Sequence, residues 1–565
     1  MAVEKILQWM YRIFMFLCKL GFFWAMVGGF FYWISATNGH NLGALYEFFW
    51  LWVVAVGGTF LHFYNRIMSR LKHRKVNLVV DVIKSLLGAN KRATEGTVSK
   101  ADSVKEPFGI IYAREKGRYY NQSEDAPNSV AVFGTPGSGK SQGVFIPTLL
   151  SYGSKDIEKP AGEQPSVFVV DVKGELLQKS YRYRHDTMHR QIKYLSFGDS
   201  VIPEQAPGKY DPFGIMDFVE NDIQGVTEIA NALIPMAKNE SNPYFTQQAR
   251  TLLAGLLYSM YKYKAEKFSF AECLKMICSA PVSQLIETFC IGSGSESNPD
   301  CEKGWMLLSS FYKQATQEDE AESFANVRDT MLGPIRLIAT NDNIINAFDT
   351  SKGDVIRPQD LLNGDVYICI KEQYLDADQP NILNLIVNQF LSFFSRFEND
   401  TDKRILFMLD EFPRLGELKK VTEGVNLYRS RGIRFLIAAQ SIDQIKEKYG
   451  QEHFGVLMDG IGTTLVLRAV GTSAEYFSHR VGKFDKMMTS TNSGTSNQTM
   501  QFGSGSNVGS SESEQERDVF RPSFFENELQ SNKKIMILAP DGYKVADVAF
   551  AYNDKVFSAR MQGQE

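Results

Sequence analysis

The most restrictive feature of the sequence is a glycine-rich run of eight residues that follows a short apolar segment. Residues 130–133 read Val-Ala-Val-Phe, and residues 134–141 read Gly-Thr-Pro-Gly-Ser-Gly-Lys-Ser. Glycines in this pattern let the backbone wrap around phosphate groups with converging N–H groups, and the helix that follows points its positive dipole end there. The pattern requires a strand, a tight loop and a helix in succession. The sequence therefore predicts an α/β fold that contains a phosphate-binding loop (P-loop).

We expect the whole run to line the phosphates of a nucleotide. The residues concerned are Gly134, Thr135, Pro136, Gly137, Ser138, Gly139, Lys140 and Ser141. Lys140 would neutralise oxygens of the β- and γ-phosphates, and the Ser141 hydroxyl would ligate Mg²⁺. The run therefore predicts a site for a nucleoside triphosphate and its metal ion.

A second set of chemical groups follows another apolar segment, far downstream. Residues 405–409 read Ile-Leu-Phe-Met-Leu, and Asp410 and Glu411 come next. Five consecutive apolar residues indicate a strand buried on both faces, as in a parallel sheet. At the end of such a strand Asp410 could hold the Mg²⁺ water shell. Glu411 could orient the attacking water and take its proton.

A third apolar segment, residues 435–439, ends at Gln440. A glutamine beside the γ-phosphate could sense hydrolysis by gaining or losing a hydrogen bond, although a polar residue at a strand end is also common. Arg429, Arg431 and Arg434 precede or begin this segment. One of them could reach the γ-phosphate of a neighbouring subunit as an arginine finger, and solvated helix arginines are the alternative for at least two.

A fourth apolar segment, residues 167–170, is followed by Asp171 and Lys173. Ligands of α/β proteins bind at the carboxyl edge of the sheet, so we expect both residues near the site. Their spacing does not indicate a chemical role.

Residues 1–65 differ from the rest of the chain. Residues 20–36 contain no charged side chain, and residues 42–64 contain one, Glu47. Each stretch is long enough to cross a hydrocarbon core of ~30 Å as a helix. Basic residues flank the pair while the short loop between them has none, which predicts a hairpin anchor with both ends in the cytoplasm. A cleaved signal peptide is the alternative for the first stretch.

Residues 66–100 carry nine Lys or Arg side chains and only two acidic ones. They are expected to form a basic juxtamembrane connector attracted to anionic lipid, with a local contact to DNA as the alternative.

The whole chain has 61 basic and 65 acidic side chains. This balance excludes a protein held to nucleic acid by bulk positive charge.

These features, in this order, resemble one family closely: the type IV secretion coupling proteins, the membrane ATPases of bacterial conjugation. The motifs that carry the resemblance are GTPGSGKS at 134–141, DVKGE at 171–175, DPF at 211–213, LDEFPRLG at 409–416 and AAQSIDQIKEKYG at 438–450. The last two are the more specific, because a P-loop occurs in many families.

The resemblance implies a RecA-like motor domain, a homohexamer with a central channel, and hydrolysis of ATP with Mg²⁺ at subunit interfaces. It also implies a multi-pass protein of the bacterial inner membrane, with the bulk of the chain in the cytoplasm. On the matching positions, Asp410 and Glu411 become the acidic pair, Gln440 the sensor and Arg429 the finger acting in trans.

The expected domain organisation follows from the spacing of these motifs. The anchor occupies residues 1–65, the connector 66–100, the first part of the nucleotide-binding domain 101–215, an inserted all-α domain 216–346, and the second part 347–565. Within the insertion, residues 245–260 and 323–338 repeat apolar positions at helical spacing. Residues 216–345 contain 10 basic and 17 acidic side chains, a net charge of −7, with an acidic peak at 318–322. Such a surface repels phosphate and attracts a basic protein, so we expect it to dock a relaxase, an accessory factor or an effector. A solvated surface without a partner is the alternative.

Beyond residue 450, apolar runs at 463–467, 534–538 and 545–549 predict further strands. Residues 489–516 are rich in Ser, Gly, Asn and Gln, which predicts a mobile surface loop. A loop that projects into the channel or onto a partner is the alternative.

Together these features predict an inner-membrane ATPase that couples a relaxase–DNA nucleoprotein or a protein substrate to a type IV secretion channel, with single-stranded DNA as a further partner. Four alternatives are open: an effector-coupling receptor without DNA translocation, a double-stranded DNA translocase of the division or sporulation type, a secretion-channel assembly ATPase, and a non-enzymatic membrane receptor. The two-span hairpin disfavours the assembly ATPase, and the intact GKS, DE and Gln set disfavours the non-enzymatic receptor.

Overall fold

The computed structural model describes residues 103–563 except 237–239, 241, 264–265, 292–298, 317–320, 372–381, 398–402, 417 and 494–507. These residues belong to one compact unit. The anchor and the connector predicted at 1–100 lie outside the described residues. Within the described ranges, none of the helices combines the length and the apolar character that crossing a membrane requires.

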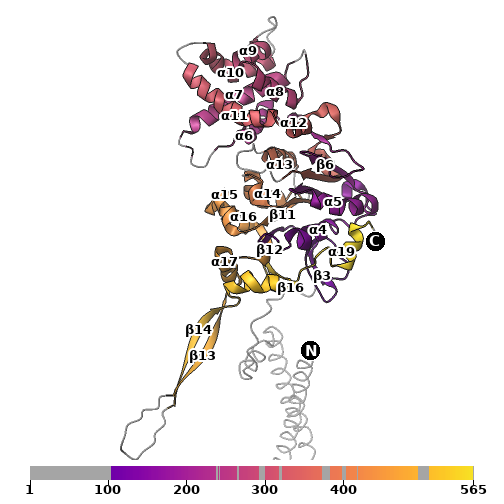
Figure 1. The fold of residues 1–565 in the computed structure, drawn as a ribbon, viewed down its shortest axis with the longest axis vertical. Helices are drawn as coiled ribbons and strands as arrows, with labels where there is room; N and C mark the ends of the chain where they lie inside the picture. Colours follow the sequence, from indigo (N-terminus) through magenta and orange to yellow (C-terminus); the bar gives the residue numbers. More distant parts are fainter. Residues whose placement is uncertain are drawn as a thin grey trace, which may run out of the picture. The chain divides into compact units, whose positions relative to one another are not determined.

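A mixed β-sheet of 12 strands runs through the described part of the chain (Figure 1). In order across the sheet, the strands are β1 (Ser103–Val104), β3 (Arg118–Gln122), β2 (Ile110–Glu115), β16 (Gly542–Asp547), β15 (Lys534–Ala539), β12 (Ile461–Arg468), β4 (Ser129–Gly134), β11 (Ile433–Ala439), β10 (Ile405–Leu409), β5 (Ser166–Asp171), β9 (Gly364–Cys369) and β6 (Gln191–Ser196). From β12 to β6 all neighbours pair in parallel, whereas from β12 back to β1 they pair antiparallel.

The strands predicted at 130–133, 167–170, 405–409 and 435–439 are confirmed as β4, β5, β10 and β11, which are adjacent in the parallel part of the sheet. Leu409 is in register with both Val170 and Ile437, and Ala439 is in register with Phe133. The four strands therefore end at one edge, and the polar residues that follow them meet there.

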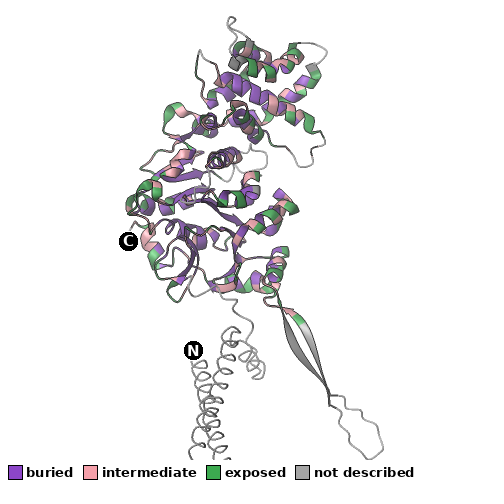
Figure 2. Cartoon of the chain, turned by 180° about the vertical axis from the view of Figure 1, so that it is seen from behind, coloured by how far each residue is buried: buried purple, intermediate pink, exposed green. Residues whose placement is uncertain are grey.

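Both faces of the parallel part are covered, which explains why its strands are apolar throughout (Figure 2). Along β4, Ala131 and Phe133 belong to one apolar core, while Val130 and Val132 belong to the core on the opposite face. Helices α13 (Ile382–Phe394), α14 (Lys419–Arg429), α15 (Ile442–Tyr449), α16 (Gln451–Gly460) and α17 (Thr472–Val481) contribute to the first core. Helices α4 (Ile146–Leu149), α5 (Glu175–Arg182) and α19 (Lys555–Met561) contribute to the second. Short helical segments include η2 (Ser141–Phe145), η4 (Tyr183–Thr187), η5 (Pro212–Asp217), η11 (Phe412–Arg414), η12 (Phe524–Glu528) and α18 (Leu529–Ser531).

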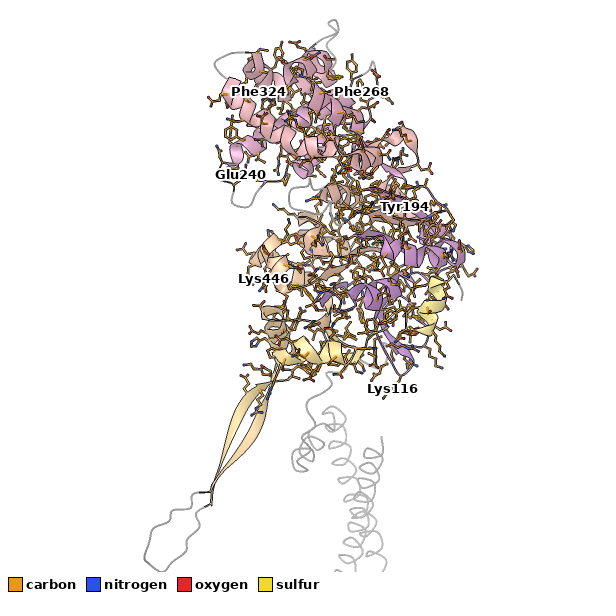
Figure 3. All side chains as sticks on the ribbon, in the orientation of Figure 1. Lys116, Tyr194, Glu240, Phe268, Phe324 and Lys446 are labelled. Atoms are coloured by element: carbon orange, nitrogen blue, oxygen red, sulfur yellow. The ribbon has the colours of Figure 1, made fainter. Side chains whose placement is uncertain are left out.

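A run of helices lies between the short strands β7 (Lys209–Tyr210) and β8 (Val355–Ile356). The helices are α6 (Asp222–Leu233), α7 (Pro243–Tyr261), α8 (Phe270–Ser279), α9 (Val282–Ile286), α10 (Pro299–Thr316), α11 (Ala321–Ala339) and α12 (Asp342–Phe348). The helices predicted at 245–260 and 323–338 are confirmed within α7 and α11. Side-chain caps mark several starts, such as the Ser269–Glu272 capping box of α8. Phe268 and Phe324, labelled in Figure 3, pack in or against the apolar core of this region.

The prediction of a loop at 489–516 is wrong for its described ends. Strands β13 (Lys483–Ser493) and β14 (Val508–Asp518) form an antiparallel hairpin, with Thr489 opposite Glu512. Low apolar content argues against a packed core, but two strands can still pair through the backbone groups that face each other while their outer groups remain open to solvent. The strands predicted at 463–467, 534–538 and 545–549 are confirmed as β12, β15 and β16, although β16 ends at Asp547.

Candidate active site

The P-loop links the end of β4 to the helical segment η2 at the carboxyl edge of the parallel strands. Gly137 and Gly139 have φ values of 73° and 94°, a region that side chains other than glycine rarely adopt. A Cβ added to Gly134 would lie 2.3 Å from the Ser138 hydroxyl oxygen. The backbone therefore favours glycine at 137 and 139, and a side chain at 134 would require Ser138 to move.

Lys140 lies in the centre of the site and is buried. Its ammonium group donates to the Gly134 carbonyl at 2.8 Å and lies 3.9 Å from a Glu411 carboxylate oxygen. Burial lowers the pKa of Lys140, while the charges of Glu411 and Asp410 act in the opposite direction. An ammonium group held among these acceptors is suited to phosphate oxygens.

Two buried hydroxyl groups of the P-loop, Thr135 Oγ1 and Ser138 Oγ, have no hydrogen-bond partner among the described residues. Buried polar groups are normally satisfied. These two hydroxyl groups could donate hydrogen bonds to a ligand. A nucleotide phosphate, which is rich in acceptor oxygens, would suit them.

Ser141 and Asp410, 269 positions apart in the chain, are joined in space. The Ser141 hydroxyl donates to Asp410 Oδ2 at 3.2 Å. Burial raises the pKa of Asp410 to about 6, and the neighbouring Glu411 charge adds to the rise. A hydroxyl and a buried carboxylate side by side are the oxygen ligands that Mg²⁺ prefers.

Glu411 and Gln440 form a second contact beside this pair. Gln440 Nε2 donates to Glu411 Oε2 at 2.9 Å, and Gln444 donates to Gln440 Oε1 at 3.4 Å. Glu411 has a φ of 55°, which is uncommon outside glycine. Residues held in this conformation cluster at functional sites, where the surrounding structure supports the strain.

Lys140, Ser141, Glu411 and Gln440 line one cavity of about 370 Å³. Its lining consists of Pro136, Gly137, Gly139, Lys140, Ser141, Gln142, Val172, Lys173, Glu175, Glu411, Arg414 and Gln440. The sequence did not single out Gln142, Glu175 or Arg414, and Gln142 donates to Glu175 at 2.6 Å. Gln142 directly follows the P-loop, and Glu175 and Arg414 lie within the DVKGE and LDEFPRLG motifs. Membership of or proximity to a recognised motif was therefore the available signal for these three residues.

Asp171, at the end of β5, has a structural position. It is buried, and its carboxylate accepts from the Lys173 and Leu177 backbone N–H groups at 3.2 and 2.9 Å. Burial raises the pKa of Asp171 to about 6, while these backbone hydrogen bonds act in the opposite direction. Lys173, by contrast, is exposed and lines the cavity.

The three arginines near β11 lie at the opposite edge of the sheet. Arg434 is buried and donates to the carbonyls of Ala126 and Gly432 at 2.6 and 2.7 Å. Arg431 donates to the Phe397 carbonyl at 3.1 Å. Arg429, the last residue of α14, is exposed. Of the three, Arg429 is the one whose side chain is directed toward solvent without such a backbone contact.

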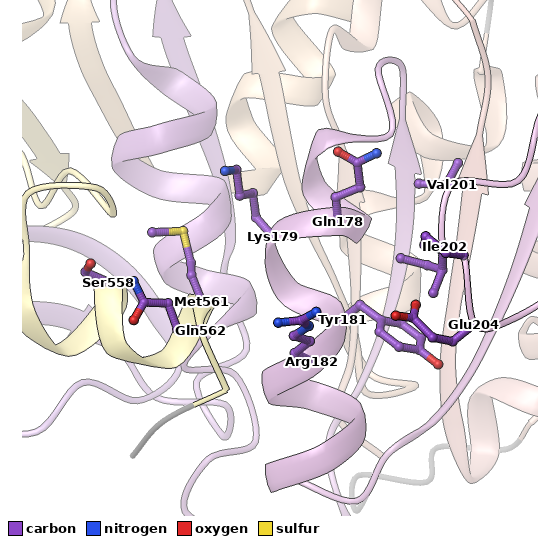
Figure 4. Close-up of a pocket in the computed structure, with 11 residues that line it drawn as sticks. Gln178, Lys179, Tyr181, Arg182, Val201, Ile202, Glu204, Ser558, Met561 and Gln562 are labelled. Carbon is purple, nitrogen blue, oxygen red and sulfur yellow. The ribbon is translucent and has the colours of Figure 1, made fainter.

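A second cavity, of about 510 Å³, lies between α5, residues 201–204 and α19 (Figure 4). Its lining consists of Gln178, Lys179, Tyr181, Arg182, Val201, Ile202, Pro203, Glu204, Ser558, Met561 and Gln562. It contains no residue of the P-loop or the acidic pair, so it is separate from the site described above.

The fold matches solved structures of the bacterial conjugative coupling protein TrwBdeltaN70. The unbound monoclinic form gives a TM-score of 0.56 at 15% identity, covering 81% of this chain and 92% of that one. The trigonal form in complex with sulphate gives 0.57 at 14% identity, covering 81% and 93%. This likeness shows a RecA-type α/β fold with a mixed sheet.

Sequence relatives point to the same group of proteins. The chain is 24% identical over 397 residues to Protein VirD4 of Rhizobium rhizogenes, covering 66% of this chain and 52% of that protein. It is 23% identical over 369 residues to the conjugal transfer protein TraG of Escherichia coli, covering 60% and 52%. The chain thus spans about half the length of the curated relatives it matches.

The model of the family described as "Type IV secretory system Conjugative DNA transfer" matches residues 80–565. Because this match covers most of the chain, the chain belongs to the type IV secretory system conjugative DNA transfer family.

Proposed function

We propose that this chain is a Mg²⁺-dependent ATPase that recruits a relaxase–DNA nucleoprotein or a protein substrate and couples it to a type IV secretion channel. One observation carries the catalytic part. The P-loop, the acidic pair and Gln440 follow three adjacent strands, and P-loop residues, Glu411 and Gln440 line one cavity. Ser141 is hydrogen-bonded to Asp410, and Gln440 to Glu411.

Each residue has a role that its position supports. Lys140 and the P-loop N–H groups would hold the phosphates, and Ser141 and Asp410 would hold Mg²⁺. Glu411 would orient a water molecule and accept its proton. Gln440, bonded to Glu411, would exchange that bond for one to the phosphate and so couple hydrolysis to movement of the chain.

Structures of TrwB, whose fold this chain shares, support ATP and Mg²⁺ as the ligands. TrwB has been solved with the non-hydrolysable ATP analogue ADPNP, with the GTP analogue GDPNP, and with ADP and Mg²⁺. In this chain, the P-loop hydroxyl groups without a described hydrogen-bond partner fit the phosphates of ATP, and the Ser141–Asp410 pair fits Mg²⁺.

A homohexamer with a finger supplied in trans fits the position of Arg429. Gln440 follows the carboxyl end of β11 and Arg429 precedes its amino end. A strand of seven residues separates the two by roughly 23 Å at about 3.3 Å per residue. Arg429 is therefore too far from the site of its own subunit and would act on that of a neighbour.

The remaining assignments follow the domain organisation expected from the sequence. Residues 1–65 would anchor the chain in the bacterial inner membrane as a two-span hairpin, and residues 66–100 would connect the anchor to the motor. Residues 101–215 and 347–565 would form the motor, with residues 216–346 as an inserted all-α domain. The bulk of the chain would lie in the cytoplasm.

The acidic helical domain would dock the substrate protein. Its net charge of −7 favours a basic partner over a phosphate backbone. Its acidic peak includes residues 318–320, which lie outside the described residues. Charge reversal at Glu318, Asp319 and Glu320 should abolish docking of the substrate protein and leave ATP hydrolysis intact, whereas unchanged docking would exclude this surface.

The test of the function is the ATP hydrolysis rate of the full chain in detergent, with and without single-stranded DNA, and with Lys140→Ala as the blank. Stimulation by DNA that the variant lacks would support a DNA-coupled motor. A response to a cargo protein but not to DNA would move the function to effector secretion. Absence of Lys140-dependent hydrolysis in a verified hexamer would overturn the proposal and leave a docking receptor.

A further inference from the structure

The segment that follows β16 packs directly on the P-loop. The Ala551 N–H donates to the Gln142 carbonyl at 2.8 Å. A Cβ added to Gly139 would lie 2.5 Å from Phe550 Cε1, and one added to Gly143 would lie 2.5 Å from Val548 Cγ1. Residues near the C-terminus and the P-loop are therefore fitted to each other, although some 400 positions separate them in the chain.

Both ends of this segment are fixed. Upstream it continues from β16, which is paired with β15 along its full length. Downstream the buried Asp554 accepts from Tyr119 Oη at 2.9 Å and from Arg114 Nη1 at 2.7 Å, and it caps the start of α19. The backbone between β16 and α19 is thus held in position before any ligand binds.

This fixed segment presents a pair of aromatic rings. The centroids of Phe550 and Tyr552 lie 5.4 Å apart, with an angle of 30° between the ring planes. Phe550 is half-buried against Gly139, whereas Tyr552 is 58% exposed. The exposed ring of Tyr552 is a flat apolar surface next to Phe550, and Phe550 itself packs against Gly139 of the P-loop.

The pair and the groups suited to the γ-phosphate follow strands on opposite sides of β4. Strand β4, which leads into the P-loop, lies between β11 and β12. The groups suited to the γ-phosphate, Glu411 and Gln440, follow β10 and β11 on one side. The segment with Phe550 and Tyr552 follows β16, on the β12 side. A nucleotide whose γ-phosphate meets Glu411 and Gln440 would therefore direct its nucleoside toward the second side.

We propose that Phe550 and Tyr552 form the platform on which the purine base of the nucleoside triphosphate stacks, with Tyr552 as the outer ring. This inference rests on the function proposed above, because it assigns the base of the nucleotide whose phosphates the P-loop holds. Stacking on an aromatic ring is tolerant of the base edge. ATP and GTP should therefore bind with similar affinity, and a pyrimidine triphosphate more weakly than either.

The test compares two ligands, Mg–ATP and Mg–inorganic triphosphate, on the full chain in detergent. Removing the ring by Tyr552→Ala should raise the Kd for ATP roughly tenfold and leave the Kd for inorganic triphosphate unchanged. Tyr552→Phe keeps the ring and should bind both ligands as the natural chain does. Phe550→Leu, which removes the ring but keeps an apolar side chain near Gly139, should also weaken ATP binding selectively.

The outcomes separate this inference from the proposed function. An unchanged Kd for ATP in Tyr552→Ala, or an equal loss for both ligands, would overturn the platform while binding that depends on Lys140 remains. If Lys140→Ala binds ATP and inorganic triphosphate as tightly as the natural chain does, the P-loop does not hold the phosphates. That result would overturn the proposed function, and the platform with it.

Discussion

The two edges of the parallel sheet use similar charged side chains in different ways. At the carboxyl edge, Lys140 and Glu411 line a cavity, and Asp410 accepts a hydrogen bond from Ser141, which also lines it. Their contacts are to groups that a ligand could replace. At the amino edge, Arg184 and Asp365 are fully buried and paired at 2.8 Å, and Arg184 also donates to two backbone carbonyls. The first arrangement leaves room for chemistry, and the second holds strands and loops together.

Arg429 is the exception at the amino edge, because it is exposed while Arg434 is locked by backbone carbonyls. If it acts in trans, Arg429→Ala and Lys140→Ala should each lower ATP hydrolysis about 10³-fold or more. A mixture of the two variants should regain part of the rate, since some interfaces then combine an intact Lys140 with an intact Arg429. The rate of phosphate release by the mixed oligomer is the measurement. No recovery in a verified mixed oligomer would remove Arg429 from the site, and Arg434→Lys serves as the control for a merely structural loss.

The buried pair at the amino edge should control stability and not catalysis. Arg184→Ala leaves the Asp365 carboxylate buried, with Arg190, 3.5 Å away, as its remaining cationic partner among the described residues. Removing one partner of a buried pair costs roughly 3–5 kcal/mol. Denaturant unfolding followed by circular dichroism should show this loss, while Arg429→Ala should unfold as the natural chain does. A cost below about 1 kcal/mol would mean that the pair is not a determinant of the fold.

A smaller effect should come from Asp171, which is buried behind the carboxyl edge. Burial raises the pKa of Asp171 from 3.8 to about 6. Between pH 3.8 and pH 6 this carboxyl group is therefore mostly protonated in the folded state and mostly ionised in the unfolded state. This group therefore favours folding increasingly as the pH falls through 6, and its ionised form opposes folding above 6. Relative to Asp171→Asn, the natural chain should gain roughly 1 kcal/mol between pH 7.5 and pH 5. Thermal unfolding of both chains at the two pH values measures this difference, and a pH-independent difference would contradict it.

Much of the carboxyl edge could be predicted from the sequence. Strands of consecutive apolar residues end in Gly134, Asp410 and Gln440, and in a parallel sheet such ends meet. The adjacency of Ser141 and Asp410 follows from this rule once strand order is known. The strands and the residues at their ends follow from local pattern, whereas the adjacency also needs the strand order.

The features that could not be predicted depend on contacts between distant segments. The residues around Glu411 and Arg434 in the sequence predict neither the left-handed backbone of Glu411 nor the hydrogen bonds that fix the Arg434 side chain. The contact between Phe550 and Gly139 requires that residues from opposite ends of the described chain share one sheet. The sequence did not predict the hairpin of β13 and β14. Its strands pair through backbone hydrogen bonds, and a polar sequence without apolar alternation gives no sign of such pairing.

The measurement that tests the central claim most directly is the comparison of Mg–ATP binding and hydrolysis in Glu411→Gln. If the carboxyl edge is a hydrolytic site, this variant should bind Mg–ATP with a Kd within a few-fold of the natural chain and hydrolyse it on the order of 10³-fold more slowly. Lys140→Ala should lose binding as well as hydrolysis. Hydrolysis by Glu411→Gln at the natural rate would contradict the account, because the group placed beside Lys140 and Gln440 would then have no part in the reaction.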